Sequence, residues 1–467
     1  MNAQFLAGAA SGSIMPERDM IDNSIHSCMT VRFDEPGSPL RAKALALSFG
    51  ERRLILIALD LAVLKNAHAD HIRAAVAAEL GIQSKDIVLS CSHSHSTPFA
   101  EPLDRPHPFL DLIVKRCIET AKEAWASRQP ARFGHGVTHV VGASFNTRVP
   151  LPDGRVKFTR DFREGLASGR TVDPRLSVVR IDDADGRPIA GWVRFAAHPA
   201  CVIFDAPVSA EYPGYMTEQL EKTVSRGAPV LFGFGSSGDV NCVPMFGTEA
   251  DSQRLGLNLA NLVAETFESI RTKPPHRMAV VSGEVDLPLD PPPDPQTLER
   301  EIAEVERFIA DLDRDPRLEW VLGVNCKKDW PVEKKKSHAR PLAEWARQVR
   351  QALADGWAFP TSWPRRITSI VVDDLGLVFA SGEPFVELGL DLAARSPLAD
   401  TLLMAMGNGA DGYLGTDEDR RRGGYEMYTL VRYYSLGDDH RPLPYAQGAG
   451  EKFVQGCLDL IEACRKR

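Results

Sequence analysis

Strand-like segments alternate with amphipathic helical segments along most of this chain, and this alternation restricts the possible folds more than any other feature. Aliphatic and β-branched runs at 40–49 and 53–61 have the pattern of two strands joined by a turn. A helical pattern follows at 67–80, and residues 86–91 form another apolar run. Such an order is typical of α/β proteins. We therefore expect mixed β-sheets covered by helices.

The same alternation continues through the rest of the chain. Further strands are expected at 176–181, 189–197, 230–234, 367–381 and 401–406. Further helices are expected at 109–128, 214–225, 252–271 and 451–467. We find no internal repeat and no low-complexity tract.

The segment 286–363 differs from its surroundings in composition. It begins with a proline-rich stretch, continues with a charged helical pattern at 296–313 and ends in a polar region that contains tryptophan. Long inserts in compact domains are often functional. We expect a single domain at 1–467, with 286–363 as a helical insertion and a candidate lid. The lysine-rich run within it, at 327–336, is expected to be a solvated loop.

The composition excludes several classes of protein. Apolar residues make up 43% of the chain and charged residues 25%, as in ordinary globular proteins. The net charge of -8 offers no basic surface for nucleic acid. The longest apolar run, 54–64, is about half the ~20 residues that a membrane-spanning helix needs, and it contains Asp60. We expect a small-molecule substrate as the partner, with no nucleic acid and no transmembrane segment; a homo-oligomer stays open.

The cysteines and the N-terminus indicate a compartment. The first residues lack the basic start and the long apolar stretch of a secretory signal. The 8 cysteines include no Cys-x-x-Cys pair, so neither a thiolate zinc site nor a redox motif is present. We expect reduced thiols in a cytoplasmic protein.

Five of the expected strands end in polar clusters that a simple turn does not require. The clusters cover residues 91–98, 198–199, 235–241, 381–384 and 407–413. In open α/β sheets, ligand sites form outside the carboxyl ends of the strands. We expect the clusters to converge on one metal site at the carboxyl ends of core strands.

The first cluster contains two histidines, His93 and His95, which an extended chain points to the same side. Imidazole nitrogens, together with a carboxylate and other oxygens from separate strands, are typical of a hydrolytic zinc site that is open to water. Each residue also has a simpler explanation. The two histidines could form a hydrogen-bonded turn, His198 could be a core histidine, Glu383 could cap a helix and Tyr413 could belong to the core.

Several motifs, in order along the chain, match those of one known family. They are Ala7-Gly8, Ile14-Met15-Pro16, residues 40–44 and 59–61, Ser92-His93-Ser94-His95-Ser96, Asn146-Thr147-Arg148, Ala197-His198-Pro199, residues 209–214, Gly382-Glu383, Asn408, Tyr413 and Tyr425-Glu426. Their order resembles the N-terminal catalytic domain of the neutral (non-lysosomal) ceramidase family, from about residue 7 to about residue 428.

The resemblance implies roles for individual residues. The zinc ligands of the family fall on His93, His198, Glu383 and Tyr413, and the implied cofactor is Zn²⁺. His95 falls on a substrate-side position, and Arg148 falls on a position that reaches the substrate. Tyr425 falls within the family's Tyr-Glu pair.

Two features depart from the family pattern. Residues 238–242 read Gly-Asp-Val-Asn-Cys, so Asn241 stands where the family has its proposed catalytic serine. Asparagine cannot act as that nucleophile. The chain also ends soon after the catalytic region, before the family's C-terminal immunoglobulin-like domain. We therefore expect a small or polar substrate rather than ceramide.

These residues together predict a zinc-dependent hydrolase that cleaves an amide bond, or an ester or lactone, by direct attack of zinc-bound hydroxide. His95 is the expected general acid and base. Arg148, Tyr425 and the Asn241 amide are expected to donate to the oxyanion or to the substrate. Two alternatives stay open: a metal-binding homologue that is non-catalytic or regulatory, and a zinc lyase or isomerase.

Overall fold

An eight-stranded mixed sheet lies at the centre of the computed structural model, which describes residues 4–21, 31–99, 107–203, 206–433, 436 and 440–467. The strand order is β13-β11-β10-β6-β1-β3-β4-β5. The strands are β1 (Phe5–Ser13), β3 (Arg41–Phe49), β4 (Arg52–Leu59), β5 (Ile87–Cys91), β6 (Gln129–His139), β10 (Arg175–Asp183), β11 (Pro188–Phe195) and β13 (Val230–Phe234). The pairs β4–β5 and β11–β13 are parallel, and the other neighbours are antiparallel.

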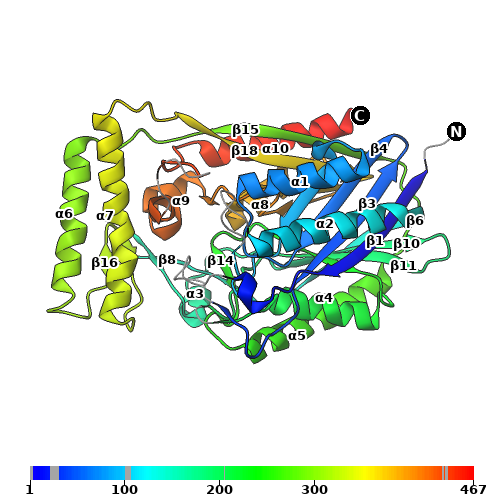
Figure 1. Cartoon of the computed structure of the whole chain (residues 1–467), viewed down its shortest axis with the longest axis horizontal. Helices are drawn as coiled ribbons and strands as arrows, with labels where there is room; N and C mark the ends of the chain where they lie inside the picture. Colours follow the sequence, from blue (N-terminus) through cyan, green and yellow to red (C-terminus); the bar gives the residue numbers. More distant parts are fainter. Residues whose placement is uncertain (1–3, 22–30, 100–106, 204–205, 434–435, 437–439) are drawn as a thin grey trace.

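Four helices contribute to the apolar core on one face of this sheet. They are α1 (Asn66–Leu80), α2 (Pro108–Ala126), α4 (Glu211–Thr223) and α5 (Glu249–Ser269). Figure 1 shows α1 and α2 lying along the strands, with α4 and α5 farther along the sheet. Ala44 and Ile57 of the sheet share this core with Ile72 of α1 and Leu259 of α5.

The opposite face packs against a second sheet with the order β15-β18-β19-β21. Its strands are β15 (Met278–Pro288), β18 (Ser362–Val372), β19 (Leu375–Ala380) and β21 (Asp400–Met404). Helices α8 (Val386–Arg395) and α10 (Ala449–Arg465) share a further apolar core with this second sheet. The result is a stack of helices, sheet, sheet and helices, which confirms the expected mixed α/β fold.

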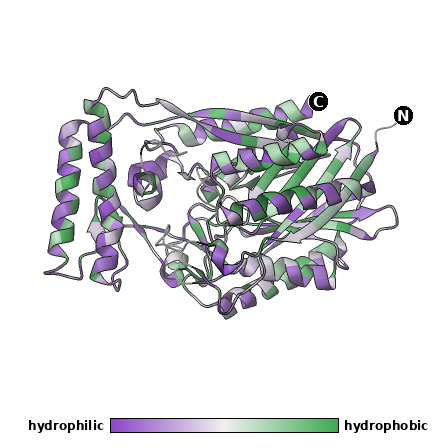
Figure 2. Ribbon diagram, viewed as in Figure 1, coloured by the Kyte–Doolittle hydropathy of each residue, from purple (hydrophilic) through white to green (hydrophobic). Residues whose placement is uncertain are grey.

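Burial on both faces explains the continuous apolar runs of the central strands. In β3, Ala44 belongs to the core beneath the helices, whereas the next residue, Leu45, belongs to the core between the sheets. Neighbouring side chains of a strand point to opposite faces, so both must be apolar where both faces are covered. Figure 2 shows this hydrophobic character along the central strands.

The remaining elements are short and lie in the connections. They are β2 (Val31–Arg32), β7 (Ser144–Asn146), β8 (Arg148–Pro150), β9 (Val156–Phe158), β12 (Ala206–Pro207), β14 (Val240–Cys242), β16 (Trp320–Val321), β17 (Val324–Asn325), β20 (Glu383–Pro384), β22 (Tyr413–Leu414), α3 (Phe162–Ala167) and α9 (Asp417–Arg422). Several of them carry the candidate site described below.

Two differences from the sequence-based expectations concern strands. The run expected at 367–381 is split between two antiparallel strands, β18 and β19, whose turn contains Asp373 with a φ of 52°. Strand β6 is longer than the short stretch between His135 and His139 that the sequence indicated as a strand. Its central residues are mostly half-buried, and arginine, histidine and threonine interrupt its apolar pattern. Such an interrupted run carries little strand signal, because the pattern depends on burial.

The segment between β15 and β18 contains a hairpin of two helices, α6 (Pro295–Asp311) and α7 (Val332–Ala354). Helix α7 was not predicted, because its lysine-rich start resembles a loop. The expectation that this run is entirely solvated is wrong. Lys335 is buried, and its Nζ donates to three backbone carbonyls at 2.8–3.1 Å.

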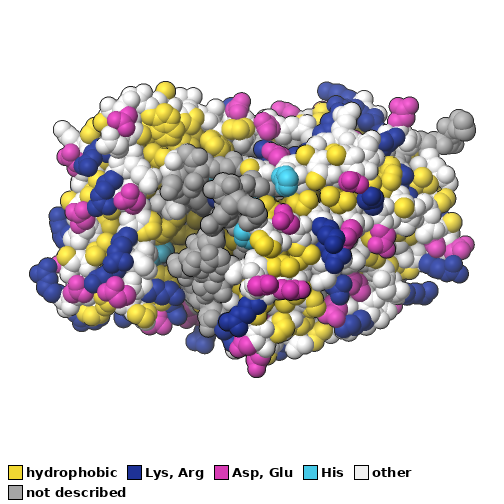
Figure 3. Space-filling model, viewed as in Figure 1, with side chains coloured by type: hydrophobic (Ala, Val, Ile, Leu, Met, Phe, Trp, Pro, Cys, Tyr) yellow, Lys and Arg dark blue, Asp and Glu magenta, His cyan; other side chains and the backbone are white. Residues whose placement is uncertain are grey.

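The surface charges and the cysteines of the described segments can be compared with the expectations from composition. Basic and acidic side chains are intermingled on the face shown in Figure 3. Among the described helices, none is long and apolar enough to cross a membrane. The seven cysteines of the described segments are free thiols, and Cys28 lies outside those segments.

Candidate metal centre

His93 lies just after the carboxyl end of β5, and a backbone carbonyl from the segment after β4 holds its imidazole. Its Nδ1 lies 2.6 Å from the carbonyl oxygen of Ala62. A carbonyl oxygen can only accept a hydrogen bond, so Nδ1 carries the proton and Nε2 presents its lone pair. His93 has a φ of 65°, and such left-handed backbone is uncommon for a residue with a side chain. The loop after β5 therefore holds Nε2 in a fixed direction.

His198 follows β11 and is held in the same way. Its Nδ1 lies 3.0 Å from the carbonyl oxygen of Val240 in β14, and its backbone N–H donates to the same oxygen at 2.9 Å. Its Nε2 faces the site. Metal-bound histidines commonly donate their other ring nitrogen to a backbone carbonyl or a carboxylate, which fixes the tautomer and the orientation of the ring.

Glu383, at the start of β20, joins the two histidines. Its Oε2 lies 3.0 Å from His198 Nε2 and 3.3 Å from His93 Nε2. Burial by itself would raise the pKa of Glu383, but the two imidazoles hold that pKa well below its usual range. Glu383 is therefore a carboxylate at neutral pH and supplies negative charge between two imidazole nitrogens.

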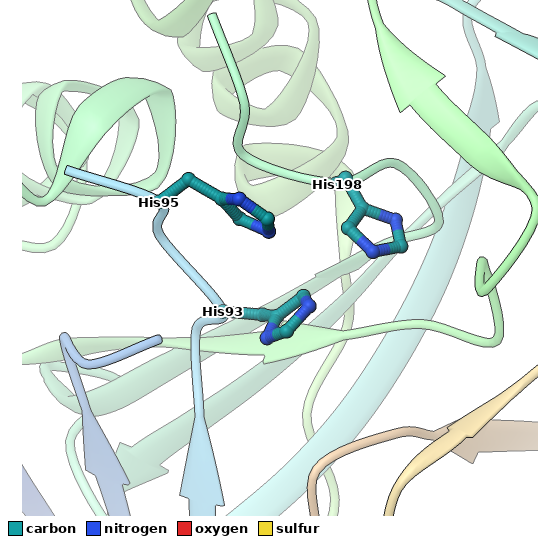
Figure 4. Close-up of side chains that lie close together, drawn as sticks. All are labelled: His93, His95 and His198. Carbon is teal, nitrogen blue, oxygen red and sulfur yellow. The ribbon is translucent and has the colours of Figure 1, made fainter. Parts of the chain in front are cut away.

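His95 completes a group of three histidines, shown in Figure 4. One ring nitrogen from each of His93, His95 and His198 lies within 4.8 Å of the others. The Nε2 atoms of His93 and His95 are buried and make no hydrogen bond. Burial, with the neighbouring imidazoles, lowers the pKa of His95 well below its ordinary value, so this ring is neutral at pH 7.

Tyr413 is brought to the centre by strand pairing. Strands β20 and β22 are parallel and place Glu383 opposite Tyr413. Burial, and then the charge of Glu383, raises the pKa of the Tyr413 hydroxyl well above its ordinary value. The Tyr425 ring lies beyond it, with the two ring centroids 6.0 Å apart. A phenol at this place can join the ligand set once a cation favours its ionised form.

Glu211 is a residue whose role sequence reasoning missed. Its side chain is fully buried. It accepts hydrogen bonds from the loop that carries His93 and His95 and from the loop that follows His198. In the first loop, Ser96 Oγ donates at 3.0 Å and the backbone N–H of His95 at 3.2 Å. In the second loop, the backbone N–H of Cys201 donates at 2.7 Å. Glu211 therefore sets the distance between the loops that carry the three histidines.

The sequence analysis included Glu211 in a motif but predicted no function for its side chain. The residue belongs to the 209–214 motif and begins α4 with a φ of 51°. Its partners lie 115 and 10 positions away along the chain, so no local pattern indicates the contact. Burial raises the pKa of Glu211 well above its ordinary value, whereas the donors from Ser96 and Cys201 oppose that shift.

The guanidinium of Arg148 is engaged by protein groups. The side chain is 1% exposed and pairs with the carboxylates of Glu426 and Asp419. One of its nitrogens also donates to the carbonyl oxygen of Gly423 at 2.7 Å. These contacts position the segment that carries Tyr425.

Asn241 lies in β14 beside the second histidine. It forms a β-bridge with His198, and its side-chain Oδ1 is buried without a hydrogen-bond partner. The thiols of Cys201 and Cys242 lie behind it with their sulfur atoms 3.3 Å apart. Asn241 thus lies in the strand whose backbone is bridged to His198.

The donor atoms fit a metal ion. The Nε2 atoms of His93 and His198 and the carboxylate of Glu383 come from three separate strand ends. Among the described residues, the buried Nε2 atoms of His93 and His95 have no hydrogen-bond partner. Structural and catalytic zinc sites use such nitrogen and oxygen ligands, and catalytic sites keep one position open. His93, His198 and Glu383 would hold the ion, with His95 and Tyr413 adjacent.

Comparison with solved structures identifies the fold. A crystal structure of neutral ceramidase from Pseudomonas aeruginosa superposes with a TM-score of 0.69 and 18% sequence identity, covering 100% of this chain and 75% of that one. A structure described as a ceramidase complexed with C2 gives a TM-score of 0.68 and 18% identity, covering 100% of this chain and 76% of that one. The neutral-ceramidase-like fold indicated by the motifs is thereby confirmed. Neither the protein-family models nor the curated proteins match the sequence.

Proposed function

We propose that this chain is a zinc-dependent hydrolase that cleaves an amide bond, or an ester or lactone, in a small or polar substrate. The observation that supports the proposal best is the pair of imidazoles anchored through Nδ1, which both direct Nε2 at Glu383. Such anchoring is unnecessary for a core histidine but is typical of a metal ligand. The neutral-ceramidase-like fold supports the hydrolase class.

A bound zinc ion supplies a Lewis acid that polarises a carbonyl and makes water acidic enough to ionise near neutral pH. The protein supplies the rest of the chemistry. His95 is neutral at pH 7 and has a buried Nε2 without a hydrogen bond, so it can accept a proton from the attacking water. The same imidazole then returns the proton to the leaving nitrogen or oxygen.

Polar groups next to the histidines are assigned to the substrate carbonyl. We assign to Tyr425 a hydroxyl donor, because its ring lies against Tyr413 at the centre. We assign to Asn241 an amide donor, because it is bridged to His198 and its side-chain NH2 group can donate to a carbonyl oxygen. Preorganised donors of this kind stabilise a developing oxyanion. Arg148 is assigned a positioning role through Glu426 and the backbone of Gly423.

Ceramide is not assigned as the substrate. Asn241 occupies the position of the proposed catalytic serine in the resembled family, and an amide has no nucleophilic oxygen comparable to a hydroxyl. The route we propose avoids a covalent intermediate, because water attacks the carbonyl directly.

A metal-dependence assay tests the proposal. Zinc content is measured, and turnover is followed on a panel of amides, esters and lactones with native protein, with chelated protein and with zinc restored. We expect about one zinc per chain and turnover of at least one class that chelation abolishes and zinc restores. Turnover that chelation leaves unchanged would contradict the proposal. Zinc binding without turnover of any panel member would favour a metal-binding protein without catalysis.

A further inference from the structure

Arg160 follows β9 and lies between two aromatic rings. Its guanidinium carbon is 4.7 Å from the centroid of Phe158 and 4.9 Å from that of Trp330, which belongs to the insertion. An arginine held between ring faces is attracted by their quadrupoles and keeps its nitrogen donors at the edges of the sandwich. The body of the protein, through Phe158, and the insertion, through Trp330, thus both contact this cation.

Within the described segments, Arg160 has no carboxylate partner. The described ionisable groups that act on its charge are Tyr425, Cys326, Tyr433 and the carboxylate of Glu426. Glu426 already pairs with Arg148. The side chain of Arg160 is half-buried, which withdraws part of its charge from water and lowers the pKa of the guanidinium. A withdrawn charge is unfavourable unless an opposite charge or hydrogen-bond acceptors compensate for it.

The surroundings of Arg160 on the insertion are also cationic or neutral. Lys334 Nζ lies 4.9 Å from the centroid of Trp330. His338 packs against Trp330 and against Tyr433, with ring centroids 5.3 Å apart in both pairs. Burial, and then the charges of Arg160 and Lys334, lowers the pKa of His338 to about 4, so it is neutral at pH 7. None of these described side chains of the insertion carries a negative charge.

A row of aromatic rings connects Arg160 to the candidate metal centre. Tyr413, opposite Glu383, lies 6.0 Å from Tyr425 between ring centroids. Tyr425 in turn lies 5.7 Å from Phe158 and 6.3 Å from Tyr433. Phe158 then contacts Arg160. A molecule that extends along these rings would have one end at the histidines and the other at the guanidinium.

We propose that Arg160 binds a carboxylate of the substrate, at the end remote from the bond that is cleaved. The substrate class is an amide or ester whose scissile carbonyl is joined to a carboxylate through an aliphatic or aromatic segment. That segment lies against Tyr425 and Phe158, while the carboxylate accepts hydrogen bonds from the guanidinium. The inference rests on the proposed function for its orientation, but the carboxylate site is testable without catalysis.

The probes are 4-phenylbutyrate and the uncharged alcohol of the same skeleton, 4-phenyl-1-butanol. Their affinities are measured by calorimetry or ligand-observed NMR on the whole chain, both zinc-loaded and chelated. Wild-type protein is compared with Arg160→Gln, with Arg160→Lys, and with Arg163→Gln, a matched loss of an exposed arginine nearby. Circular dichroism and the unfolding temperature show which variants keep the fold.

We expect wild-type protein and Arg163→Gln to bind the carboxylate about tenfold or more tightly than the alcohol, because hydrogen bonds to charged groups are strong. Arg160→Gln removes that preference, and Arg160→Lys keeps part of it. Equal affinity for acid and alcohol in wild-type protein, or an unchanged preference in folded Arg160→Gln, would overturn the carboxylate site. Failure of the zinc-dependent turnover assay with an intact carboxylate preference would overturn the proposed function alone.

Discussion

Glu383 Oε2 lies 3.0 Å from His198 Nε2, although the two residues are 185 positions apart in the chain. The contact joins the carboxyl end of β11, in the central sheet, to β20, which follows β19 of the second sheet. Because the ends of strands from two packed sheets meet here, the site depends on the packing between the sheets as well as on the loops.

We expect His93→Ala and His198→Ala each to lose most of the bound zinc, since each removes one oriented nitrogen donor. The zinc content of purified protein is measured by elemental analysis after gel filtration. His139→Ala, which changes an exposed histidine at the end of β6, is the control and should keep its zinc. Undiminished zinc in both ligand variants would sink the assignment.

Turnover, rather than zinc content, should respond to His95→Ala and Tyr425→Phe. Loss of a proton-transfer group costs roughly 10²–10⁴-fold in rate, and loss of one oxyanion donor costs about 10²–10³-fold. Both variants are assayed on whichever substrate of the panel is turned over, together with zinc analysis. If either variant loses its zinc, that residue is a ligand and its catalytic assignment is wrong. This outcome is most informative for His95, whose nitrogen lies within the three-histidine group.

Glu211→Gln should weaken zinc binding and lower stability although it touches no substrate. The carboxylate accepts hydrogen bonds from the N–H groups of His95 and Cys201 on its two oxygens. Whichever oxygen becomes an amide nitrogen then faces an N–H donor, and an unsatisfied buried group costs about 1–3 kcal/mol. Urea unfolding and zinc titration measure the two effects. Glu218→Gln, a partly exposed change on the same helix, is the control, and equal behaviour of the two variants would refute the positioning role.

Motif order and strand patterns predicted the fold class and the helical insertion, and they selected three residues that the structure brings together: His93, His198 and Glu383. The three residues were selected because ligand sites form outside the carboxyl ends of strands, and the structure places their side chains within 3.3 Å of one another through Glu383. Glu211 was missed because its partners are distant in sequence. The ion pairs of Arg148 with Glu426 and Asp419 were equally unpredictable, because they depend on how buried segments pack.

We expect the unfolding free energy to depend on pH through Asp239, which is fully buried just before β14. Burial, and then the nearby charge of Asp419, raises the pKa of Asp239 from 3.8 to about 6. A raised pKa means that the folded state holds the proton more tightly. The resulting stabilisation is therefore complete below about pH 4 and is lost as the pH rises through 6.

Asp239→Asn removes this titration. Between pH 4 and pH 7 the unfolding free energy of wild-type protein should fall relative to that of the variant, by on the order of 2–3 kcal/mol. Urea unfolding of chelated samples at several pH values measures the difference without interference from zinc release. Asp185→Asn, an exposed aspartate, should show no such trend. A difference between wild type and Asp239→Asn that stays constant over this range would contradict the shifted pKa.

Asn241→Ser should not by itself produce an efficient ceramidase. The substitution restores a hydroxyl at the position of the proposed family serine, but access of a lipid depends on the walls of the site as well as on one oxygen. In the carboxylate site proposed above, Arg160 belongs to those walls, and a half-buried cation disfavours a hydrocarbon chain. Hydrolysis of a short-chain ceramide by zinc-loaded wild type, Asn241→Ser and Asn241→Ala provides the measurement, with zinc content checked in each. We expect all three to keep zinc and to show little ceramide turnover, with Asn241→Ala losing rate on the amide or ester that wild type accepts. High ceramide turnover by wild type, with Asn241 in place, would show that the serine is dispensable and that the substrate assignment is wrong.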